Sequence, residues 1–204
     1  MAFIFNRLAL VMSIAAALGG YKAAAADRNT PFRPEPAASY RAKQTSGGVT
    51  VAAQAFTSSE QVKTAFGKTD PNRHGVLPVL VVIQNESGKA IRVGDLKVEY
   101  LGPDRSRVGA TPAPDVKYLT GTRRPNVMSG PTGTPKVLRR KNPLDTWEIE
   151  GRAFAAKMIP PGETASGFFY FEARHLPGSR LYLTGLSEAD TGKELFYFEI
   201  AFEE

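Results

Sequence analysis

The sequence predicts a mainly β protein, an antiparallel immunoglobulin-like sandwich with two short helices and a long Gly/Pro-rich basic loop. Residues 76–84 form an apolar run of strand length, and three further strand-like segments lie near the end of the chain. Predicted strands outnumber predicted helices by about six to two, and turn residues separate the strands. Many short strands joined by turns are typical of a sandwich.

The first 26 residues have the features of a secretory signal peptide. A short basic start precedes an eleven-residue apolar run at 8–18, and Ala24–Ala26 supplies the small residues expected before a cleavage site. The run is shorter than the roughly 20 residues that cross a bilayer, and no cysteine follows it for lipidation. We therefore expect cleavage before Asp27, export to the periplasm or the cell exterior, and no transmembrane span afterwards.

Residues 27–48 are predicted to be a flexible linker, because they contain three prolines, few apolar residues and a Ser-Gly-Gly end. A single domain, 49–204, follows. Its first strand is expected at 49–56, where apolar and polar residues alternate.

A short helix is predicted next, at about 58–66. Thr57 and Glu60 have the spacing of a capping box, and Gly67 is placed to end the helix.

The strongest predicted strand is 76–84. It is apolar on both faces, which indicates the middle of a sheet, and Pro78 is compatible with this only near the strand's start. A turn at 85–89 and a second strand at 91–101 predict a hairpin. Asn85 also begins an Asn-Glu-Ser glycosylation sequon, and its place in a turn suggests exposure.

Residues 102–142 differ in composition from the predicted strands and are predicted to be a mobile insertion, since 11 of these 41 residues are Gly or Pro.

The charge is unevenly distributed along the chain. Residues 27–142 carry 19 Lys/Arg and 9 Asp/Glu, a balance of +10, whereas 143–204 carry 5 and 11, a balance of −6. Much of the excess lies in one stretch without acids. The candidate polyanion-binding residues are Lys117, Arg123, Arg124, Lys136, Arg139, Arg140 and Lys141.

Such a cluster can attract an anionic envelope polymer or lipid head group, or it can simply be a solvated charged loop. Nucleic acid is not the expected partner, because Tyr118 is the only aromatic residue among these basic residues. A protein partner in the envelope is the other expectation.

A second helix is predicted from Asn142-Pro143 onward, with Trp147, Phe154 and Met158 on one face and a Pro-Pro-Gly end. Three strands follow, at 164–173, 180–186 and 193–203.

In the last of these strands, Phe196, Phe198, Ile200 and Phe202 alternate on one face. The four consecutive aromatics at 168–171 are expected to be core rather than a ligand platform, because a strand divides them between its two faces.

Two segments resemble a known family. LPVLVVIQNESGKAIRV (77–93) and PPGETASGFFYFEA (160–173) look like the telokin-like, immunoglobulin-type domains of bacterial secreted and lipid-anchored proteins. The resemblance implies a sandwich that serves as a binding or accessory module. The chain lacks the lipobox cysteine and has the long basic loop, so the resemblance does not imply lipid anchoring.

The composition limits the chemistry. Zero cysteines exclude disulfides, thiol catalysis, thiolate zinc sites and iron–sulfur clusters, and only His74 and His175 supply imidazole. Residues 70–75 begin like a calcium loop, but Val81 stands where the bidentate glutamate belongs, so a turn is expected instead. Gly67-Lys68-Thr69 ends like a phosphate-binding loop whose first glycine position holds Val62. We expect no metal and no cofactor.

Catalytic candidates are few. No nucleophile elbow accompanies His175, whereas Glu172 and Glu199 lie on strands expected to be neighbours and could form a carboxylate pair. The favoured interpretation is an exported, non-enzymatic binding or scaffolding module of the cell envelope. The alternatives are an exported hydrolase that uses the carboxylate pair, and a subunit of an envelope assembly that docks through the loop or an open sheet edge.

Overall fold

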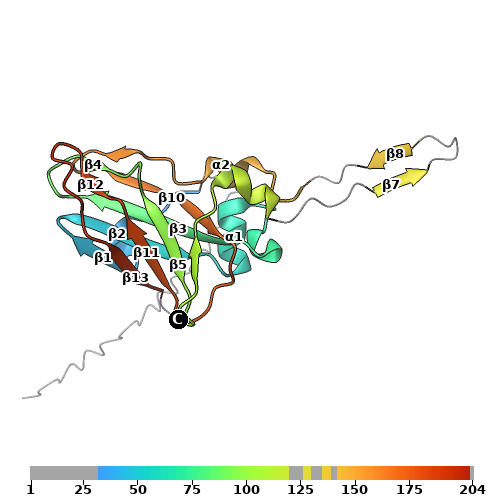
Figure 1. Ribbon diagram of the computed structural model, residues 1–204, viewed down its shortest axis with the longest axis horizontal. Helices are drawn as coiled ribbons and strands as arrows, with labels where there is room; N and C mark the ends of the chain where they lie inside the picture. Colours follow the sequence, from blue (N-terminus) through green and yellow to red (C-terminus); the bar gives the residue numbers. More distant parts are fainter. Residues whose placement is uncertain (1–31, 120–125, 130–134, 139–141, 203–204) are drawn as a thin grey trace, which may run out of the picture. The chain divides into compact units, whose positions relative to one another are not determined.

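The structure is a computed structural model that describes residues 32–119, 126–129, 135–138 and 142–202. Its main body is a β-sandwich of two antiparallel four-stranded sheets (Figure 1), so the predicted fold class is confirmed. The first sheet has the order β1-β2-β3-β10, with bounds Lys43–Ser46, Val49–Ala55, Leu77–Asn85 and Thr164–Phe171. The second has the order β13-β11-β5-β6, with bounds Phe198–Ala201, Arg180–Thr184, Lys97–Leu101 and Arg107–Gly109.

The remaining elements are short. Three strands form a small sheet in the order β12-β4-β9, with bounds Ser187–Glu188, Ile91–Arg92 and Met158–Ile159. Strands β7 (Asn126–Ser129) and β8 (Pro135–Leu138) pair with each other. The α-helices are α1 (Ser59–Phe66) and α2 (Trp147–Gly151), and the 3₁₀ helices are η1 (Ala37–Ser39), η2 (Pro71–His74) and η3 (Ala113–Tyr118). No helix among the described residues has the length and apolar character needed to span a membrane.

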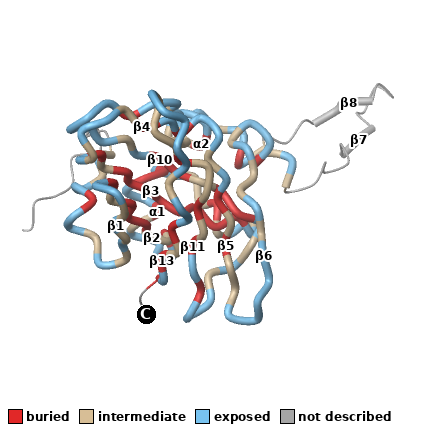
Figure 2. The backbone as a smooth tube through the Cα atoms, turned by 60° about the vertical axis from the view of Figure 1, so that its left-hand side comes forward, coloured by how far each residue is buried: buried red, intermediate tan, exposed pale blue. Residues whose placement is uncertain are grey.

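Two hydrophobic clusters hold the first sheet from both sides, and the buried segments in Figure 2 follow its central strands. Val79, Val81 and Ile83 of β3 pack between the sheets, whereas Leu80 and Val82 pack beneath α1 and α2. Strand β3 pairs with β2 on one side and β10 on the other. The prediction of a central strand buried on both faces is therefore confirmed, and Pro78 lies at its second position.

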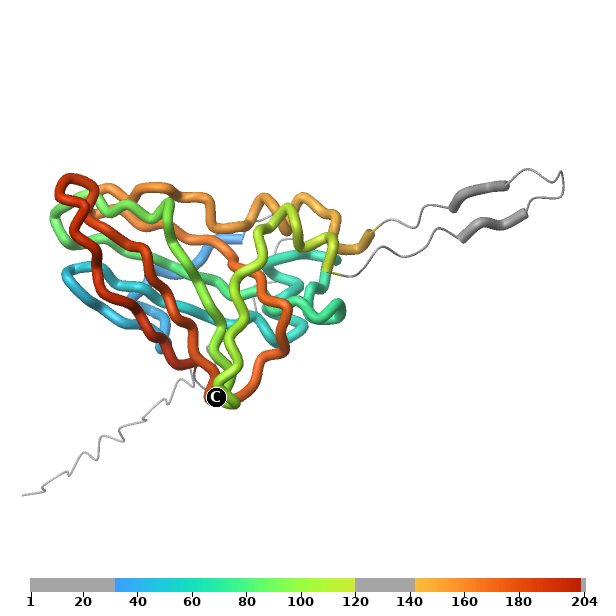
Figure 3. Tube along the Cα trace, viewed as in Figure 1, coloured from blue at the N-terminus to red at the C-terminus, as the bar shows by residue number. Residues whose placement is uncertain are grey.

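The predicted hairpin after β3 is wrong. Strand β5 belongs to the opposite sheet and pairs with β11, and the intervening β4 joins the small sheet. The trace in Figure 3 shows the chain leaving β3 and crossing to the other layer. The alternation of apolar and polar residues at 97–101 predicts a strand with one buried face. A strand in either sheet of the sandwich has such a face, so the pattern could not tell the two sheets apart.

The predicted linker is wrong for its described part, 32–48. Strand β1 pairs with β2 through a turn at Gly47 and Gly48, where φ is +57° and +76°. Ala37 is fully buried, and the Phe32 ring lies 5.8 Å from the Phe56 ring. A few anchoring side chains therefore order a segment whose average composition is that of a linker.

The second predicted helix is also mostly wrong, because only Trp147–Gly151 of the predicted segment is helical. Helix α2 ends at Gly151, and the side chains of Trp147 and Met158 are 69% and 51% exposed. In α1 the capping box is shifted by one residue from the prediction, to Ser58 and Gln61. The final strand begins later than predicted, since Phe196 is 82% exposed while Phe198, Ile200 and Phe202 are buried.

Only part of the predicted insertion at 102–142 can be compared with the structure. Residues 102–119 contain β6 and η3, and Val116 of η3 is fully buried. Apart from β7, β8 and Asn142, the rest of the insertion lies outside the described residues.

Candidate functional site

Of the seven predicted polyanion-binding residues, Lys117 alone has a described side chain. Its ammonium nitrogen lies 3.9 Å from a carboxylate oxygen of Asp145 and 4.0 Å from one of Glu150. The fold thus places two acids that lie further along the chain near the Lys117 ammonium group. Lys136 lies in β8, whose side chains are not described, and the other five residues fall outside the described ranges: Arg123, Arg124, Arg139, Arg140 and Lys141.

The predicted carboxylate pair does not lie on neighbouring strands. Glu172 directly follows β10 in the first sheet, whereas Glu199 lies on β13 in the second. Glu199 accepts a hydrogen bond at 2.5 Å from the guanidinium of Arg180 on the adjacent strand. This partner holds Glu199 as a cross-strand ion pair on the sheet surface.

His175 belongs to a buried polar network. The Tyr100 hydroxyl donates to Ser179 Oγ at 2.7 Å, accepts from the Leu176 amide at 2.9 Å, and lies 3.3 Å from His175 Nδ1. Burial lowers the pKa of His175, which keeps the imidazole neutral. Ser179 is fully buried, so a substrate has no access to its hydroxyl and the network ties the 174–179 loop to β5.

The calcium-like segment forms a turn, as predicted. The Asp70 carboxylate caps η2 by accepting from the Asn72 amide at 3.1 Å, and it pairs with Arg73 at the same distance. Asn72 donates to the Phe56 carbonyl at 2.8 Å. Among the described residues, no group of three or more His, Asp or Glu side chains is arranged to hold a metal.

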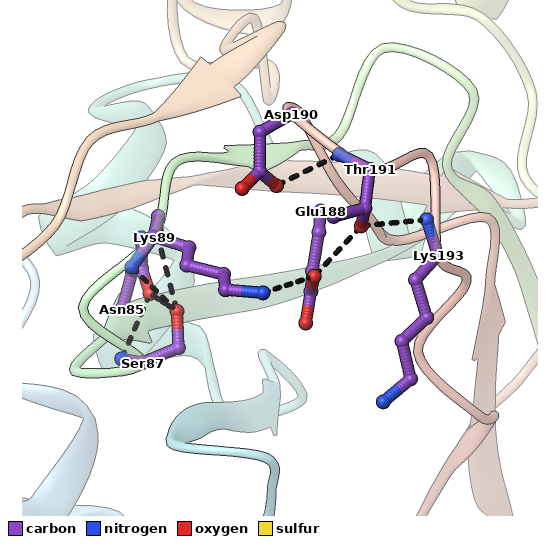
Figure 4. Close-up of polar contacts among 7 residues, drawn as sticks. All are labelled: Asn85, Ser87, Lys89, Glu188, Asp190, Thr191 and Lys193. Atoms are coloured by element: carbon purple, nitrogen blue, oxygen red, sulfur yellow. Dashed lines mark hydrogen bonds and ion pairs between the residues drawn. The ribbon is translucent and has the colours of Figure 1, made fainter.

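The exposed glycosylation site is a wrong prediction. Asn85 is fully buried, and its side-chain nitrogen donates to the carbonyls of Lys89 at 2.7 Å and Ile159 at 2.9 Å. Figure 4 shows Asn85 beside Ser87 and Lys89, with Lys89 reaching across to Glu188 at 2.6 Å. The nitrogen that glycosylation would modify is used to join two loops at this end of the sandwich.

The two long edges of the sandwich differ. On one side β1 lies beside β13, and the Glu199 amide donates to the Gln44 side chain at 2.7 Å, which links the two sheets. On the other side β10 and β6 are the edge strands, and the Thr111 amide donates to the Tyr170 carbonyl at 2.7 Å. The second edge contains a groove of about 540 Å³, which we call the β5–β10 groove.

One wall of the β5–β10 groove is aromatic. The rings of Phe154 and Phe169 stack with centroids 5.4 Å apart, and both are half-buried. Gly167 makes this wall possible, since any side chain there would overlap the backbone of Phe154. Residues 152–154 therefore lie directly on β10, with the Phe154 amide donating to the Phe168 carbonyl at 3.1 Å.

The opposite wall is aliphatic, and the rim is polar. Leu96, Val98 and Ala110 line the second-sheet side. At the rim, Glu99 is paired with Arg107 at 3.1 Å, whereas no ion pair is found for Lys97 within the described parts of the chain. The groove thus combines apolar walls with an exposed lysine, Lys97, in its lining.

The described residues line three other cavities. A cleft of about 520 Å³ lies at the edge of β2, and one of about 360 Å³ is lined by Lys68, Arg73 and His74. A third, of about 540 Å³, lies beside β9 and β10. Each of these cavities, like the β5–β10 groove, has a single carboxylate in its lining. These carboxylates are Glu35 in the β2-edge cleft, Asp70 beside Lys68, Glu163 beside β9, and Glu99 in the β5–β10 groove.

Sequence reasoning missed the β5–β10 groove because its lining comes from five separate segments. One local signal was present: an isolated glycine inside an aromatic strand, Gly167, indicates close approach of another backbone. Phe154 was assigned to a helix face, which hid its role as a wall residue.

Comparisons with known proteins add little. No family model matches the chain, and no curated protein matches its sequence. The ycdA protein of Bacillus subtilis is 12% identical with a TM-score of 0.36, and the match covers 78% of this chain but only 38% of that one. The secreted protein MPT63 of Mycobacterium tuberculosis is 12% identical with a TM-score of 0.32, covering 84% and 98%. A DUF4426 family protein of Pseudomonas aeruginosa PAO1 is 12% identical with a TM-score of 0.31, covering 79% and 96%.

Proposed function

We propose that this chain is an exported, non-enzymatic binding module of the cell envelope that takes a single-chain anionic amphiphile in the β5–β10 groove. The observation that carries the proposal is the groove itself, with its stacked Phe154–Phe169 wall, its aliphatic opposite wall and Lys97 at the mouth. The amino-terminal signal-peptide pattern supports export, and the resemblance to telokin-like domains supports a binding role.

The chemistry of the groove favours an apolar tail with an acidic head. An acyl chain placed between Phe154 and Ala110 removes apolar surface of both partners from water, which stabilises the complex by about 25 cal/mol per Å². A carboxylate or phosphate head at the mouth meets Lys97, while Glu99 is already neutralised by Arg107. The volume lies within the range of small-ligand sites.

The hydrolase alternative has less support in the geometry. A carboxylate pair in one concave site is what glycoside hydrolysis requires, and each of the four cavities named above has one carboxylate in its lining. Glu172 and Glu199 belong to different sheets. These placements favour a module that binds over one that hydrolyses.

The experiment is a titration of the delipidated mature protein with a fluorescent long-chain fatty acid, followed by competition with an unlabelled fatty acid and a fatty alcohol of equal length. We expect saturable binding and stronger competition by the acid. Lys97→Gln should weaken competition by the acid several-fold and leave competition by the alcohol unchanged. Lys63→Gln, at an exposed position of α1, should change neither competition. Absence of saturable binding, or an equal effect of Lys97→Gln on both competitors, would contradict the proposal.

A second candidate function is polyanion binding by the basic segment. One observation favours it: the cleft lined by Lys68, Arg73 and His74 also includes Asn142 and Pro143, which directly follow Arg139–Lys141 in the chain. Changing Arg123, Arg124, Arg139 and Arg140 together to serine should abolish binding of an anionic envelope polymer and leave the thermal transition unchanged. Retention of binding at physiological salt would show that the segment is only charged surface.

A further inference from the structure

The polar cleft at the edge of β2 has a backbone feature that the proposed function does not use. The β1–β2 register ends at the pair Lys43–Ala52, and one more bond, from the Ala53 amide to the Ala42 carbonyl, continues it at 3.0 Å. Before Ala42 the chain turns away into η1. The edge of β2 therefore loses its neighbour two residues before the strand ends.

Alternation fixes which groups face the cleft. In an antiparallel strand, successive residues direct their amide and carbonyl to opposite sides. Ala53 bonds toward β1, and Phe56 bonds toward β3 by donating to the Pro78 carbonyl at 2.9 Å. Ala55 therefore presents its amide and its carbonyl toward the side that β1 has vacated, where it lines the cleft.

The side chains around Ala55 supply further donors. Gln61 uses its side-chain oxygen to accept from the amides of Thr57 at 3.3 Å and Ser58 at 3.2 Å, so its NH₂ group is left to donate. The Tyr40 hydroxyl accepts from the Glu35 amide at 3.0 Å, which leaves its own hydrogen to donate. The cleft thus offers donors from Gln61, Tyr40 and Ala55 around one strand-edge carbonyl.

An apolar floor completes the cleft. Phe202 is 7% exposed and packs edge-on against the His175 ring, with centroids 5.4 Å apart. Both rings line the cleft with Ala53. Because burial lowers the pKa of His175 and so favours its uncharged form, the floor is suited to a neutral side chain.

We propose that the β2-edge cleft binds a short extended peptide, which adds one doubly hydrogen-bonded residue to the open edge at Ala55 and places a neutral side chain over Phe202 and His175. An extended backbone alternates N–H and C=O groups, which is the pattern that the edge and its flanking donors complement. Saccharide hydroxyls can bond these groups singly, but a saccharide does not present the paired N–H and C=O of one extended residue to the Ala55 edge. Only one edge residue is open, so the affinity of an isolated peptide should be weak.

The test is heteronuclear NMR of the mature protein with millimolar amounts of a capped tetrapeptide pool of neutral residues. We expect fast-exchange shifts at the Ala55 amide, the Gln61 side-chain NH₂ and the His175 ring. The same pool N-methylated at every amide should lose at least tenfold in apparent affinity, and maltotriose should shift none of these signals.

Ala55→Pro removes the open donor while leaving the β2–β3 ladder intact, because that amide does not bond to β3. It should lose the peptide-induced shifts, and Thr45→Pro on β1 serves as an edge control away from the cleft. If Ala55→Pro fails to fold, the N-methylated pool still tests the proposal on the unmodified protein. No shifts with the unmodified pool, equal shifts with the N-methylated pool, or stronger shifts with maltotriose would overturn the proposal.

Discussion

The side-chain nitrogen of Asn85 donates to the carbonyl of Ile159 at 2.9 Å, and this bond joins the end of β3 to β9 across 74 residues of sequence. The same nitrogen reaches the carbonyls of Lys89 and Pro160, while the Asn85 oxygen accepts from the Ser87 hydroxyl at 2.6 Å. One buried side-chain amide therefore bonds to backbone carbonyls of the turn after β3 and of residues 159–160.

Asn85→Ala should destabilise the fold by about 2 to 3 kcal/mol, because it removes the three hydrogen bonds that this buried side-chain nitrogen donates. Urea unfolding measures the loss. Gln84→Ala is the matched control, since the Gln84 side-chain amide donates to Glu86 at the surface, and it should cost well under 1 kcal/mol. Expression in a glycosylating host should leave Asn85 unmodified; a glycan at Asn85 on folded protein would contradict the burial.

Val81→Asp should prevent folding. Val81 is 0% exposed in the middle of β3, where its side chain packs between the two sheets. An unpaired carboxylate there costs about 4 kcal/mol or more, which is comparable with the whole stability of many domains. Thr164→Asp, on the exposed end of adjacent β10, is the control. A soluble Val81→Asp protein with an unchanged thermal transition would show that the strand is not central.

Gly167→Ala should disturb the aromatic wall. A methyl group at this position overlaps the backbone of Phe154, so residues 152–154 must move away from β10. We expect a lower unfolding midpoint and weaker binding of the fluorescent fatty acid. Gly162→Ala is an informative comparison, because space is open around it and only its positive φ of 79° opposes the change. Unaltered stability and binding in Gly167→Ala would exclude this close packing.

Stability should fall on mild acidification because of His175. Burial lowers its pKa in the folded state, so the unfolded chain takes up a proton first as pH drops below the ordinary value of about 6.5. The loss grows until pH reaches the folded-state pKa and is constant below it. The urea midpoint measured from about pH 7.5 to about pH 5 should fall less in His175→Gln than in the unmodified protein or in His74→Gln. Parallel curves for all three would contradict this assignment.

The mature protein should begin at or near Asp27. The Ala24–Ala26 stretch behind a short apolar run is the pattern that signal peptidases cleave. Intact mass analysis of exported material measures the terminus. Finding Met1 on exported protein would refute cleavage.

The elements that the sequence predicted best are those with strong local patterns. The β3 segment is apolar at nearly every position, and the aromatics of β10 divide between the two clusters as strand alternation requires. The linker at 32–48 could not be recognised as structured, because its order depends on Phe32 meeting Phe56 and Phe168, which are distant in sequence. The average composition of a segment does not reveal single buried side chains of this kind.

The candidate sites were less predictable for a related reason. The β5–β10 groove takes its walls from β5, the segment after β6, residues 153–154 and β10, and the hairpin expectation placed β5 in the wrong sheet. Asn85 looked like an exposed acceptor because a sequon reports local sequence, whereas its burial comes from residues 159–160. The acids near the Lys117 ammonium group, Asp145 and Glu150, lie 28 and 33 residues further along the chain, so the local sequence did not reveal them.

Blocking the β5–β10 groove tests the central claim most directly. Ala110→Phe places a large ring between the two walls, and Ala38→Phe adds the same ring at an exposed position of η1. Both proteins are first checked for an unchanged thermal transition and then titrated with the fluorescent fatty acid. The account predicts at least a tenfold loss of affinity for Ala110→Phe and none for Ala38→Phe. A folded Ala110→Phe protein that binds the fatty acid as tightly as the unmodified chain would contradict it.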